Sequence, residues 1–308
     1  MALLEVKNLK VYYPIKGGIM GRTIGHVKAV DDICFEINEG ETIGLIGESG
    51  CGKTTTGKAI LGLNTIHAGQ IMFEGVDITK HIGKNRTPYR QSVQMIFQDV
   101  YSSLNPKERV IDIIAEPLRN FEKLTKLEER KRVDELLAIV GLTSENASKY
   151  PHQFSGGQRQ RIGIARAIAL KPKLIVCDEP VSALDISVQA QVLNYLKDIQ
   201  AELGLSFLFI SHDLGVVKHM CERLMIMHKG RFVETGTAKE IYKEPMHVYT
   251  RRLISAIPDI NPANREANVA KRAAIMKEYE ATADKFYAPD QSVYDLKKIN
   301  DNHFVAIP

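Results

Sequence analysis

Long apolar runs are missing from this 308-residue sequence. No stretch approaches the roughly 18 consecutive apolar residues that a membrane-spanning helix needs, so the sequence predicts no such helix. The longest candidates, residues 174–177 and 205–210, have the length of buried strands. Residues 1–10 alternate charged and apolar side chains, and they lack the apolar core of a signal peptide. If the chain works at a membrane, another molecule must hold it there.

Cysteine is scarce, and neither sign of charge dominates. The four cysteines are scattered, without the paired spacing of a zinc site or a disulfide framework, so we expect reduced thiols in a cytosolic protein. The formal net charge is only +4, and no dense basic run predicts nucleic-acid binding. The remaining composition, 44% hydrophobic and 25% charged, is typical of a globular protein. The length suggests about two domains.

Strand and helix patterns alternate along the chain. Alternation or short apolar runs predict strands at residues 3–13, 28–37, 42–46, 70–78, 93–97, 174–177, 206–210, 224–228 and 231–234. Helical spacing predicts helices at residues 54–63, 110–118, 128–140, 155–170, 187–203 and 267–287. The β–α–β order around residues 174–210 indicates a parallel sheet and therefore an α/β fold. The final stretch of the chain shows no clear period.

Residues 47–54 fit the pattern G-x-x-x-x-G-K-[ST] between an apolar strand and a helix. Glycines let the backbone wrap a phosphate chain with its N–H groups inward, and the helix aims its positive end at the same anion. Lys53 is expected to reach the β and γ phosphates, and the Thr54 hydroxyl to ligate Mg²⁺. The alternative is a turn that binds nothing. Expected nucleotide contacts are Gly47, Glu48, Ser49, Gly50, Cys51, Gly52, Lys53, Thr54 and Thr55.

Two carboxylates, Asp178 and Glu179, follow the apolar strand at residues 174–177. Phosphate loops lie at the same carboxyl edge of a sheet, so Asp178 is expected in the Mg²⁺ shell. Glu179 is expected to orient and deprotonate the water that attacks the γ phosphate. By themselves, two acids after a strand are more often a helix N-cap. The glycine-rich loop makes the catalytic interpretation the better one.

A second anion site is indicated at residues 154–158, where a serine and two glycines open a predicted helix. This segment resembles the LSGGQ signature of ATP-binding cassette (ABC) transporters, with Phe154 replacing the leading leucine. Over about residues 3–234 the chain is similar to the nucleotide-binding subunit of that superfamily. The resemblance implies two subunits stacked head to tail, with each signature acting on the partner's ATP. The residues so assigned are Ser155, Gly156, Gly157 and Gln158.

Four further residues resemble family motifs in the family's order. Tyr13 resembles the aromatic residue that stacks on adenine, and Gln98 the glutamine that contacts Mg²⁺ and the attacking water. Asp185 lies in a segment that resembles the loop crossing the dimer interface, and His212 resembles the histidine on the γ phosphate. The implied fold is a RecA-like P-loop ATPase core with an N-terminal antiparallel β-layer. The implied domains are residues 1–240, including a helical subdomain at about 101–170, and a C-terminal extension at 241–308.

A finer resemblance points to the oligopeptide/dipeptide importer branch. It is carried by residues 96–99, 102–106, 150–153, 182–191, 245–250 and 253–258, and Met246 and Val248 depart from the usual pattern. The end of the chain, around Tyr294 and residues 303–305, resembles the second ATPase subunit of such systems. Some relatives carry a cysteine cluster for an iron–sulfur centre. No cysteine follows Cys221, so we expect no such cluster.

The resemblance implies that ATP hydrolysis, with Mg²⁺, powers import of oligopeptides or dipeptides. The implied partners are a second, related but non-identical ATPase subunit, two transmembrane permeases and, indirectly, an extracytoplasmic solute-binding protein, with no nucleic acid. The chain is then peripheral, on the cytoplasmic face of the cell membrane. Three alternatives stay open: a nickel, glutathione or other small-solute importer, a soluble ABC ATPase acting on ribosomes or nucleic acid, and a scaffold that binds nucleotide without hydrolysis.

The sequence also predicts a role for the extension and a property of Cys51. Residues 241–308 are expected to support a subunit interface, with Tyr249 and Phe304 as anchors, or else to form a loosely packed tail over apolar surface. Cys51, beside a helix N-terminus, is a candidate for a lowered thiol pKa. The alternative is a small side chain that fits the loop.

Overall fold

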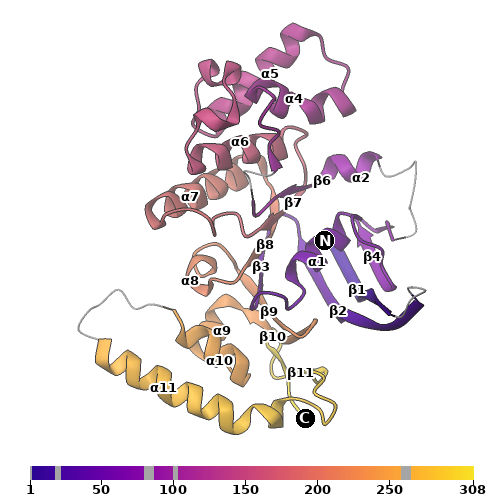
Figure 1. Ribbon diagram of the computed structural model, residues 1–308, viewed down its shortest axis with the longest axis vertical. Coiled ribbons are helices and arrows are strands. Elements are labelled where there is room, and N and C mark those ends of the chain that lie inside the picture. Colours follow the sequence, from indigo (N-terminus) through magenta and orange to yellow (C-terminus); the bar gives the residue numbers. More distant parts are fainter. Residues whose placement is uncertain (1, 18–21, 80–86, 100–102, 258–264) are drawn as a thin grey trace. The chain divides into compact units, whose positions relative to one another are not determined.

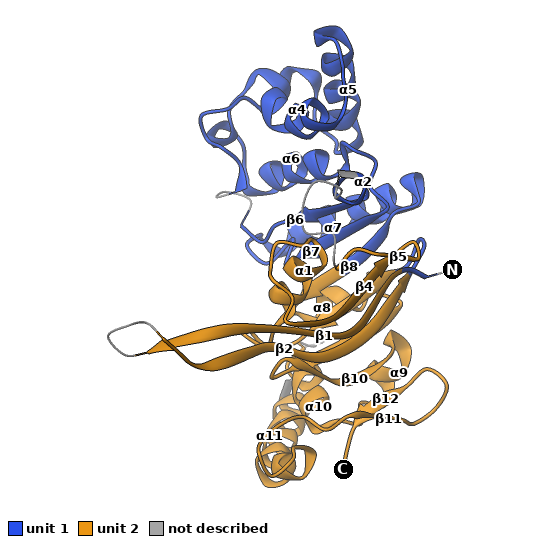
Figure 2. Cartoon of the chain, turned by 90° about the vertical axis from the view of Figure 1, so that its right-hand side faces the viewer, with its two compact units in different colours: residues 1–3, 38–41, 80–208 blue, residues 4–37, 42–79, 209–308 orange. Residues whose placement is uncertain are grey.

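The computed structural model describes residues 2–17, 22–79, 87–99, 103–257 and 265–308 (Figure 1). Figure 2 shows its two compact units: the first contains residues 1–3, 38–41 and 80–208, and the second contains residues 4–37, 42–79 and 209–308. Both units contain helices and strands, which confirms the α/β class. Residues 102 and 258, at the edges of two segments of the branch resemblance, lie outside the described residues.

The expected antiparallel layer forms from β1 (Ala2–Gly17), β2 (Arg22–Asn38), β4 (Ala68–Phe73) and β5 (Val76–Asp77), in the order β2-β1-β4-β5. Leu3 near the start of β1 is buried, and from Leu4 onward the buried positions are first Leu4 and Val6, then Leu9 and Val11. This change of phase follows from an irregularity in the β1–β4 pairing between Lys7 and Lys10, because one extra residue moves the next side chains to the opposite face.

The second unit also contains β3 (Thr42–Ile46), β9 (Arg223–His228) and β10 (Arg231–Thr237). Strand β3 is parallel to β9, and β9 and β10 form an antiparallel pair. Every residue of β3 is buried, which explains why it is an unbroken apolar run rather than an alternating one. Helices α1 (Lys53–Ile60) and α8 (Leu214–Val217) belong to the same unit.

The first unit pairs β6 (Val93–Ile96) with β7 (Leu174–Asp178) in parallel. Its helices are α2 (Thr87–Ser92), α4 (Val110–Phe121), α5 (Lys126–Ile139), α6 (Gly156–Ile168) and α7 (Ile186–Leu203), with short 3₁₀ turns at Ser144–Ser148 and Pro151–Gln153. The expected stripe on α5 is buried at Val133, Leu136 and Leu137, where α4 and α6 pack against it. Strand β8 (Ser206–Ser211) is divided by the boundary between the units.

The C-terminal extension folds into more structure than its sequence pattern predicts. It contains α10 (Val248–Ser255), α11 (Arg265–Thr282), a 3₁₀ turn at Ala283–Phe286, β11 (Leu296–Lys298) and β12 (Phe304–Ala306), and α9 (Ala238–Lys243) leads into it. Strand β12 pairs antiparallel with β10, and β11 pairs with β12. Figure 1 shows α10 and α11 side by side. The helix predicted at residues 267–287 ends earlier than expected, at Thr282.

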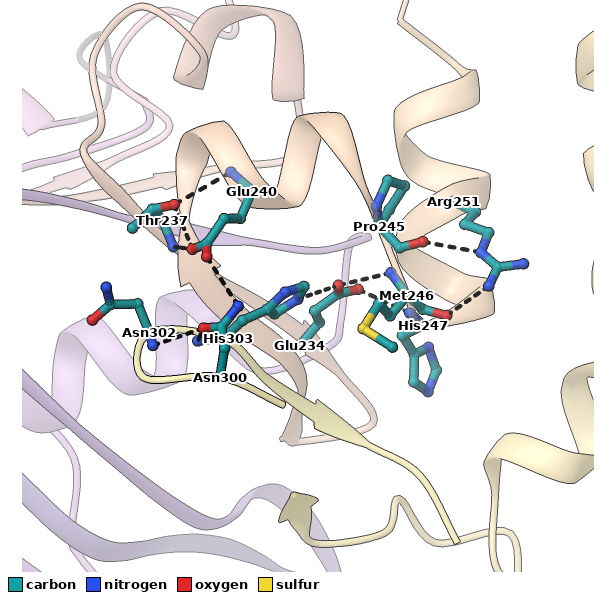
Figure 3. Close-up of polar contacts among 10 residues, drawn as sticks. All are labelled: Glu234, Thr237, Glu240, Pro245, Met246, His247, Arg251, Asn300, Asn302 and His303. Atoms are coloured by element: carbon teal, nitrogen blue, oxygen red, sulfur yellow. Dashed lines mark hydrogen bonds and ion pairs between the residues drawn. The ribbon is translucent and has the colours of Figure 1, made fainter. Parts of the chain in front are cut away.

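Glu234 on β10 forms buried hydrogen bonds that attach the extension to the rest of the unit. Its fully buried carboxylate accepts hydrogen bonds from the backbone N–H groups of Met246 and His247, at 2.8 and 3.0 Å, as Figure 3 shows. The same carboxylate lies 2.7 Å from His303 Nε2, and His303 is also buried. The interpretation of the extension as a loosely packed tail was wrong, because buried polar groups and β-pairing bind both of its ends.

Candidate functional site

The glycine-rich loop (residues 47–54) joins β3 to α1 within the second unit. A Cβ atom on Gly47 would lie 2.3 Å from the carbonyl oxygen of Met227, and one on Gly52 would lie 2.2 Å from that of Ala29. Gly52 also has φ of +115°, a conformation that L side chains rarely adopt. Backbone packing therefore requires glycine at both positions, and it fixes the curvature of the loop.

Lys53 lies inside this loop. Its side chain is buried, and Nζ donates hydrogen bonds to the carbonyl oxygens of Gly47 and Glu48, at 2.7 and 2.9 Å. The N-cap of α1 is Gly52, which has no side chain to bond the first-turn N–H groups. The loop thus combines a buried ammonium with the positive end of a helix, an arrangement suited to an anion.

The C-terminal extension contacts the loop, which no pattern in the sequence indicated. The backbone N–H of Glu48 donates to the hydroxyl of Tyr249 at 3.0 Å, and the Glu48 carboxylate pairs with Arg252 at 2.5 Å. Tyr249 is fully buried within its own chain, so its expected role as an anchor on another subunit was wrong. The sequence showed a tyrosine near the start of an amphipathic helix, but it gave no indication of the residue that the tyrosine contacts.

Cys51 does not have the lowered pKa that its position suggested. The thiol is buried, and burial raises its pKa above the ordinary value, although Lys53 acts in the opposite direction. The cysteine is a small side chain packed in the loop, as the alternative interpretation held.

In the first unit, the predicted catalytic carboxylate lies against the predicted glutamine. Gln98 Nε2 donates to Glu179 Oε2 at 2.8 Å. The parallel register explains this contact, because Ile96 on β6 is opposite Cys177 on β7 and both functional residues follow two positions later. Asp178 ends β7 and is only 3% exposed, and Glu179 turns the chain with φ of +47°. Such strain in a non-glycine residue is concentrated at functional sites.

The signature residues begin α6. Ser155 is its N-cap, and its hydroxyl accepts from the N–H of Gln158, whose side chain accepts in turn from the N–H of Ser155. A Cβ atom on Gly157 would lie 2.4 Å from Val188 Cγ1 on α7, so this glycine permits close packing of the two helices. Ser155, Gly156 and Gln158 are exposed at this end of the helix.

The three remaining predicted residues lie at element ends or on the surface. Asp185 is the N-cap of α7, although its side chain makes no capping hydrogen bond. His212 is exposed in the turn after β8, where the Ser211 hydroxyl accepts from the N–H of Asp213 at 2.9 Å. Tyr13 on β1 is 43% exposed. Its neighbour Tyr12 instead stacks on His67, with ring centroids 4.6 Å apart.

The structure adds two findings on the residues that it describes. None of the helices there has both the length and the apolar character needed to cross a bilayer. Within the same residues, no three His, Cys, Asp or Glu side chains are grouped so as to hold a metal ion.

A glycine-rich strand–loop–helix with a buried lysine, an acid pair ending a parallel strand, and a serine-capped GGQ helix together define a cassette-type P-loop ATPase. The ABC transporter family model matches residues 30–182, and the model of the oligopeptide/dipeptide transporter C-terminal region matches residues 233–289. The chain belongs to the ABC transporter family of ATP-binding proteins.

Curated relatives extend this likeness along the chain. The oligopeptide transport ATP-binding protein OppF of Lactococcus lactis subsp. lactis (strain IL1403) is 54% identical, covering 99% of this chain and 96% of the relative. The glutathione import ATP-binding protein GsiA of Pectobacterium atrosepticum is 42% identical over 99% of this chain, which corresponds to 48% of that longer relative.

A solved structure confirms the fold. The ATP-binding cassette MJ0796, in a dimeric post-hydrolysis state bound to ADP and Pi, superposes with a TM-score of 0.68 at 27% identity. The match covers 76% of this chain and 98% of that cassette.

Proposed function

We propose that this chain powers import of oligopeptides or dipeptides through an ABC transporter, by ATP-driven closure and reopening of an ATPase dimer. The observation that carries the proposal is the 54% identity to an oligopeptide transport ATP-binding protein across 99% of this chain. That alignment runs through the extension, where the C-terminal family model also matches. We propose an ABC domain at residues 1–240, with its helical subdomain at about 101–170, and the extension at 241–308.

The residues present fit ATP and Mg²⁺. The glycine-rich loop is a backbone cradle that a Cβ atom at Gly47 or Gly52 would fill, and Lys53 supplies a buried positive charge beside it. Thr54, Gln98 and Asp178 offer hydroxyl, amide and carboxylate oxygens, the ligand types that Mg²⁺ prefers. Bound Mg²⁺ would neutralise charge on the β and γ phosphates. Tyr13, with its exposed ring, is proposed to stack on adenine.

Hydrolysis is assigned to Glu179 as the base that orients and deprotonates the attacking water. The hydrogen bond from Gln98 supports this role, because it holds the carboxylate in one orientation. His212 is proposed to contact the γ phosphate. In a head-to-tail pair, Ser155, Gly157 and Gln158 act on the partner's nucleotide, and Asp185 lies at the dimer interface.

The proposed assembly contains a second ATPase subunit, related and non-identical, and two transmembrane permeases. An extracytoplasmic binding protein delivers the solute, and nucleic acid has no part in the cycle. This chain would be peripheral on the cytoplasmic face of the membrane, held by the permeases.

A second candidate is import of another small solute. It is favoured by the 42% identity to a glutathione import ATP-binding protein, although this chain corresponds to only 48% of that relative. Solute selection would reside in the binding protein and permeases, so the same ATPase chemistry serves either cargo.

The test is transport by the complete complex. The chain would be expressed with its permeases and binding protein, reconstituted in proteoliposomes, and supplied with labelled tripeptide, dipeptide, glutathione or Ni²⁺. Peptide uptake supports the proposal, whereas uptake of glutathione or Ni²⁺ alone selects the second candidate. Co-purification with ribosomes instead of permeases would contradict both.

Glu179→Gln separates binding from chemistry in this assay. We expect hydrolysis and uptake to fall about 10²- to 10⁴-fold, with ATP affinity retained, because only the proton acceptor is lost. The matched control is Glu145→Gln, the same change at an exposed position in the 3₁₀ turn Ser144–Ser148, which should leave both rates unchanged. Undiminished hydrolysis by Glu179→Gln would remove this residue from the role of base.

A further inference from the structure

Glu48, the second residue of the glycine-rich loop, is held at two of its atoms by helix α10 of the extension. Its N–H donates to Tyr249 at 3.0 Å, and its carboxylate pairs with Arg252 at 2.5 Å. Tyr249 and Arg252 are three positions apart, so they lie on one face of α10. Residues about two hundred positions apart in sequence are thus joined at the loop.

The peptide unit between Gly47 and Glu48 is bonded at both of its edges. Its N–H donates to the Tyr249 hydroxyl, and its carbonyl oxygen, that of Gly47, accepts from Lys53 Nζ at 2.7 Å. A trans peptide is planar and directs its N–H and C=O groups in opposite directions. The tyrosine therefore sets the orientation of a carbonyl that fixes the lysine.

The Tyr249 hydroxyl is itself firmly positioned. The residue is fully buried, and its ring stacks on His228 with centroids 4.2 Å apart. Burial raises the pKa of the Tyr249 hydroxyl, so it stays neutral and does not place a negative charge beside the loop.

Arg252 has a defined position as well. Its guanidinium lies over the ring of Tyr249 at 5.2 Å and over that of Tyr279, from α11, at 4.5 Å. Two aromatic faces restrict the long side chain, which reduces the entropy lost when it pairs with Glu48.

We propose that Tyr249 and Arg252 are positioning residues for ATP: acting through Glu48, they hold the glycine-rich loop and Lys53 in the arrangement that receives phosphate. The extension is then a working part of the nucleotide site. This inference rests on the proposed ATPase function. It predicts a change in nucleotide affinity rather than in the chemical step, because neither residue is assigned to the attacking water.

The experiment compares two hydroxyl deletions in the same aromatic cluster. Tyr249→Phe removes the hydrogen bond to the loop and keeps the ring. Tyr287→Phe removes a hydroxyl that bonds His228 and leaves the loop contact intact. Full-length variants are titrated with a fluorescent ATP analogue, assayed for ATP hydrolysis, and tested for thermal stability without nucleotide.

Tyr249→Phe is expected to raise both the Kd and the KM for ATP about three- to tenfold, the loss of one hydrogen bond, with kcat within about twofold. Tyr287→Phe should keep the wild-type Kd even if its thermal stability falls equally. A wild-type Kd in Tyr249→Phe, or an equal rise in Tyr287→Phe, would overturn the inference. Failure of the wild-type chain itself to bind ATP would count against the proposed function instead.

Arg252 gives an independent measurement if Tyr249→Phe fails to fold. Arg252→Gln should raise the Kd about two- to fivefold, as expected for one partly exposed ion pair, and Arg252→Lys should restore most of the affinity. The control is Arg251→Gln, whose guanidinium bonds Pro245, Met246 and Glu278 rather than the loop. Equal effects at both arginines would contradict a positioning role.

Discussion

The two helix N-termini that the family resemblance assigns to phosphate are built differently. At the start of α1, the N-cap is Gly52 with φ of +115°, and the buried Lys53 follows it. At the start of α6, the N-cap is the exposed Ser155 with φ of −65°, and a reciprocal pair with Gln158 bonds its backbone N–H groups. Close backbone packing determines the geometry of the α1 end. At the α6 end, hydrogen bonds from a side-chain pair satisfy backbone N–H groups.

The two helix ends therefore differ in how much a bound anion would stabilise them. A helix end with its own capping box has less to gain from an anion than one whose N-cap has no side chain. We therefore expect the α1 end to hold the nucleotide of its own chain, and the α6 end to contact a nucleotide that is already held by a partner.

The largest effect is expected from Gly52→Ala, which disrupts the backbone of the glycine-rich loop at the start of α1. The new methyl group would lie 2.2 Å from the Ala29 carbonyl oxygen at a φ of +115°, so the loop must move. We expect ATP affinity, measured by fluorescent-nucleotide titration, to fall at least about tenfold. The structure of the α6 end should be unaffected.

The control for that variant is Gly75→Ala. Gly75 also has a positive φ, +77°, but the space around its missing Cβ is open. It carries the backbone strain without the collision and should retain wild-type affinity. If Gly52→Ala also bound ATP normally, the loop would not be shaped by this close approach.

A smaller effect on binding, with a separate effect on turnover, is expected from Ser155→Arg. The bulky charge should leave ATP binding by the same chain within about twofold of wild type, and hydrolysis by the dimer should fall because the partner's nucleotide is blocked. Thr125→Arg introduces the same arginine at the N-cap of α5, which also has a capping box, and should only lower stability, by about 0.5–2 kcal/mol. Weakened ATP binding in Ser155→Arg would mean that both helix ends serve one nucleotide in one chain.

The smallest effect is a pH dependence of the free energy of unfolding. It arises from two histidines in the unit that carries α1. Burial lowers the pKa of His247 from 6.5 to about 3 and that of His228 to about 4, so both are neutral in the folded chain at pH 7. As the pH falls from about 6.5 toward 4, the unfolded chain binds protons that the folded chain does not. The free energy of unfolding should therefore fall, by at most about 1.4 kcal/mol per pH unit for His247.

Thermal unfolding between pH 7.5 and 5 measures this slope. His247→Asn should reduce the slope and leave the contribution of His228, because asparagine can still cap α10 and does not titrate. The exposed His219→Asn should keep the wild-type slope. A slope unchanged in His247→Asn would contradict the assignment to this buried histidine.

Local patterns allowed much of the core to be predicted. Strand β3 was predicted at its observed bounds, because a fully buried strand is an unbroken apolar run, and Ser155 was predicted as the N-cap of α6. Gln98 and Glu179 were named separately from the sequence. Their contact depends on the register of β6 and β7, strands that are far apart in the chain.

The extension escaped prediction for a related reason. Strands β11 and β12 are three residues each, too short to display alternation, and β12 depends on pairing with β10 about seventy residues earlier. The burial of Tyr249 likewise comes from distant elements, and an exposed or a buried aromatic side chain looks the same in a sequence.

The buried carboxylate of Glu234 has a consequence for how the extension comes apart. One side chain serves the start of α10 and, through His303, the strand that ends the fold. Removing either partner leaves buried carboxyl oxygens with fewer hydrogen bonds, which is costly enough to weaken the other attachment too. Detachment of residues 241–308 should therefore be all-or-none, and amide exchange in α10 and β12 should rise together rather than strand by strand.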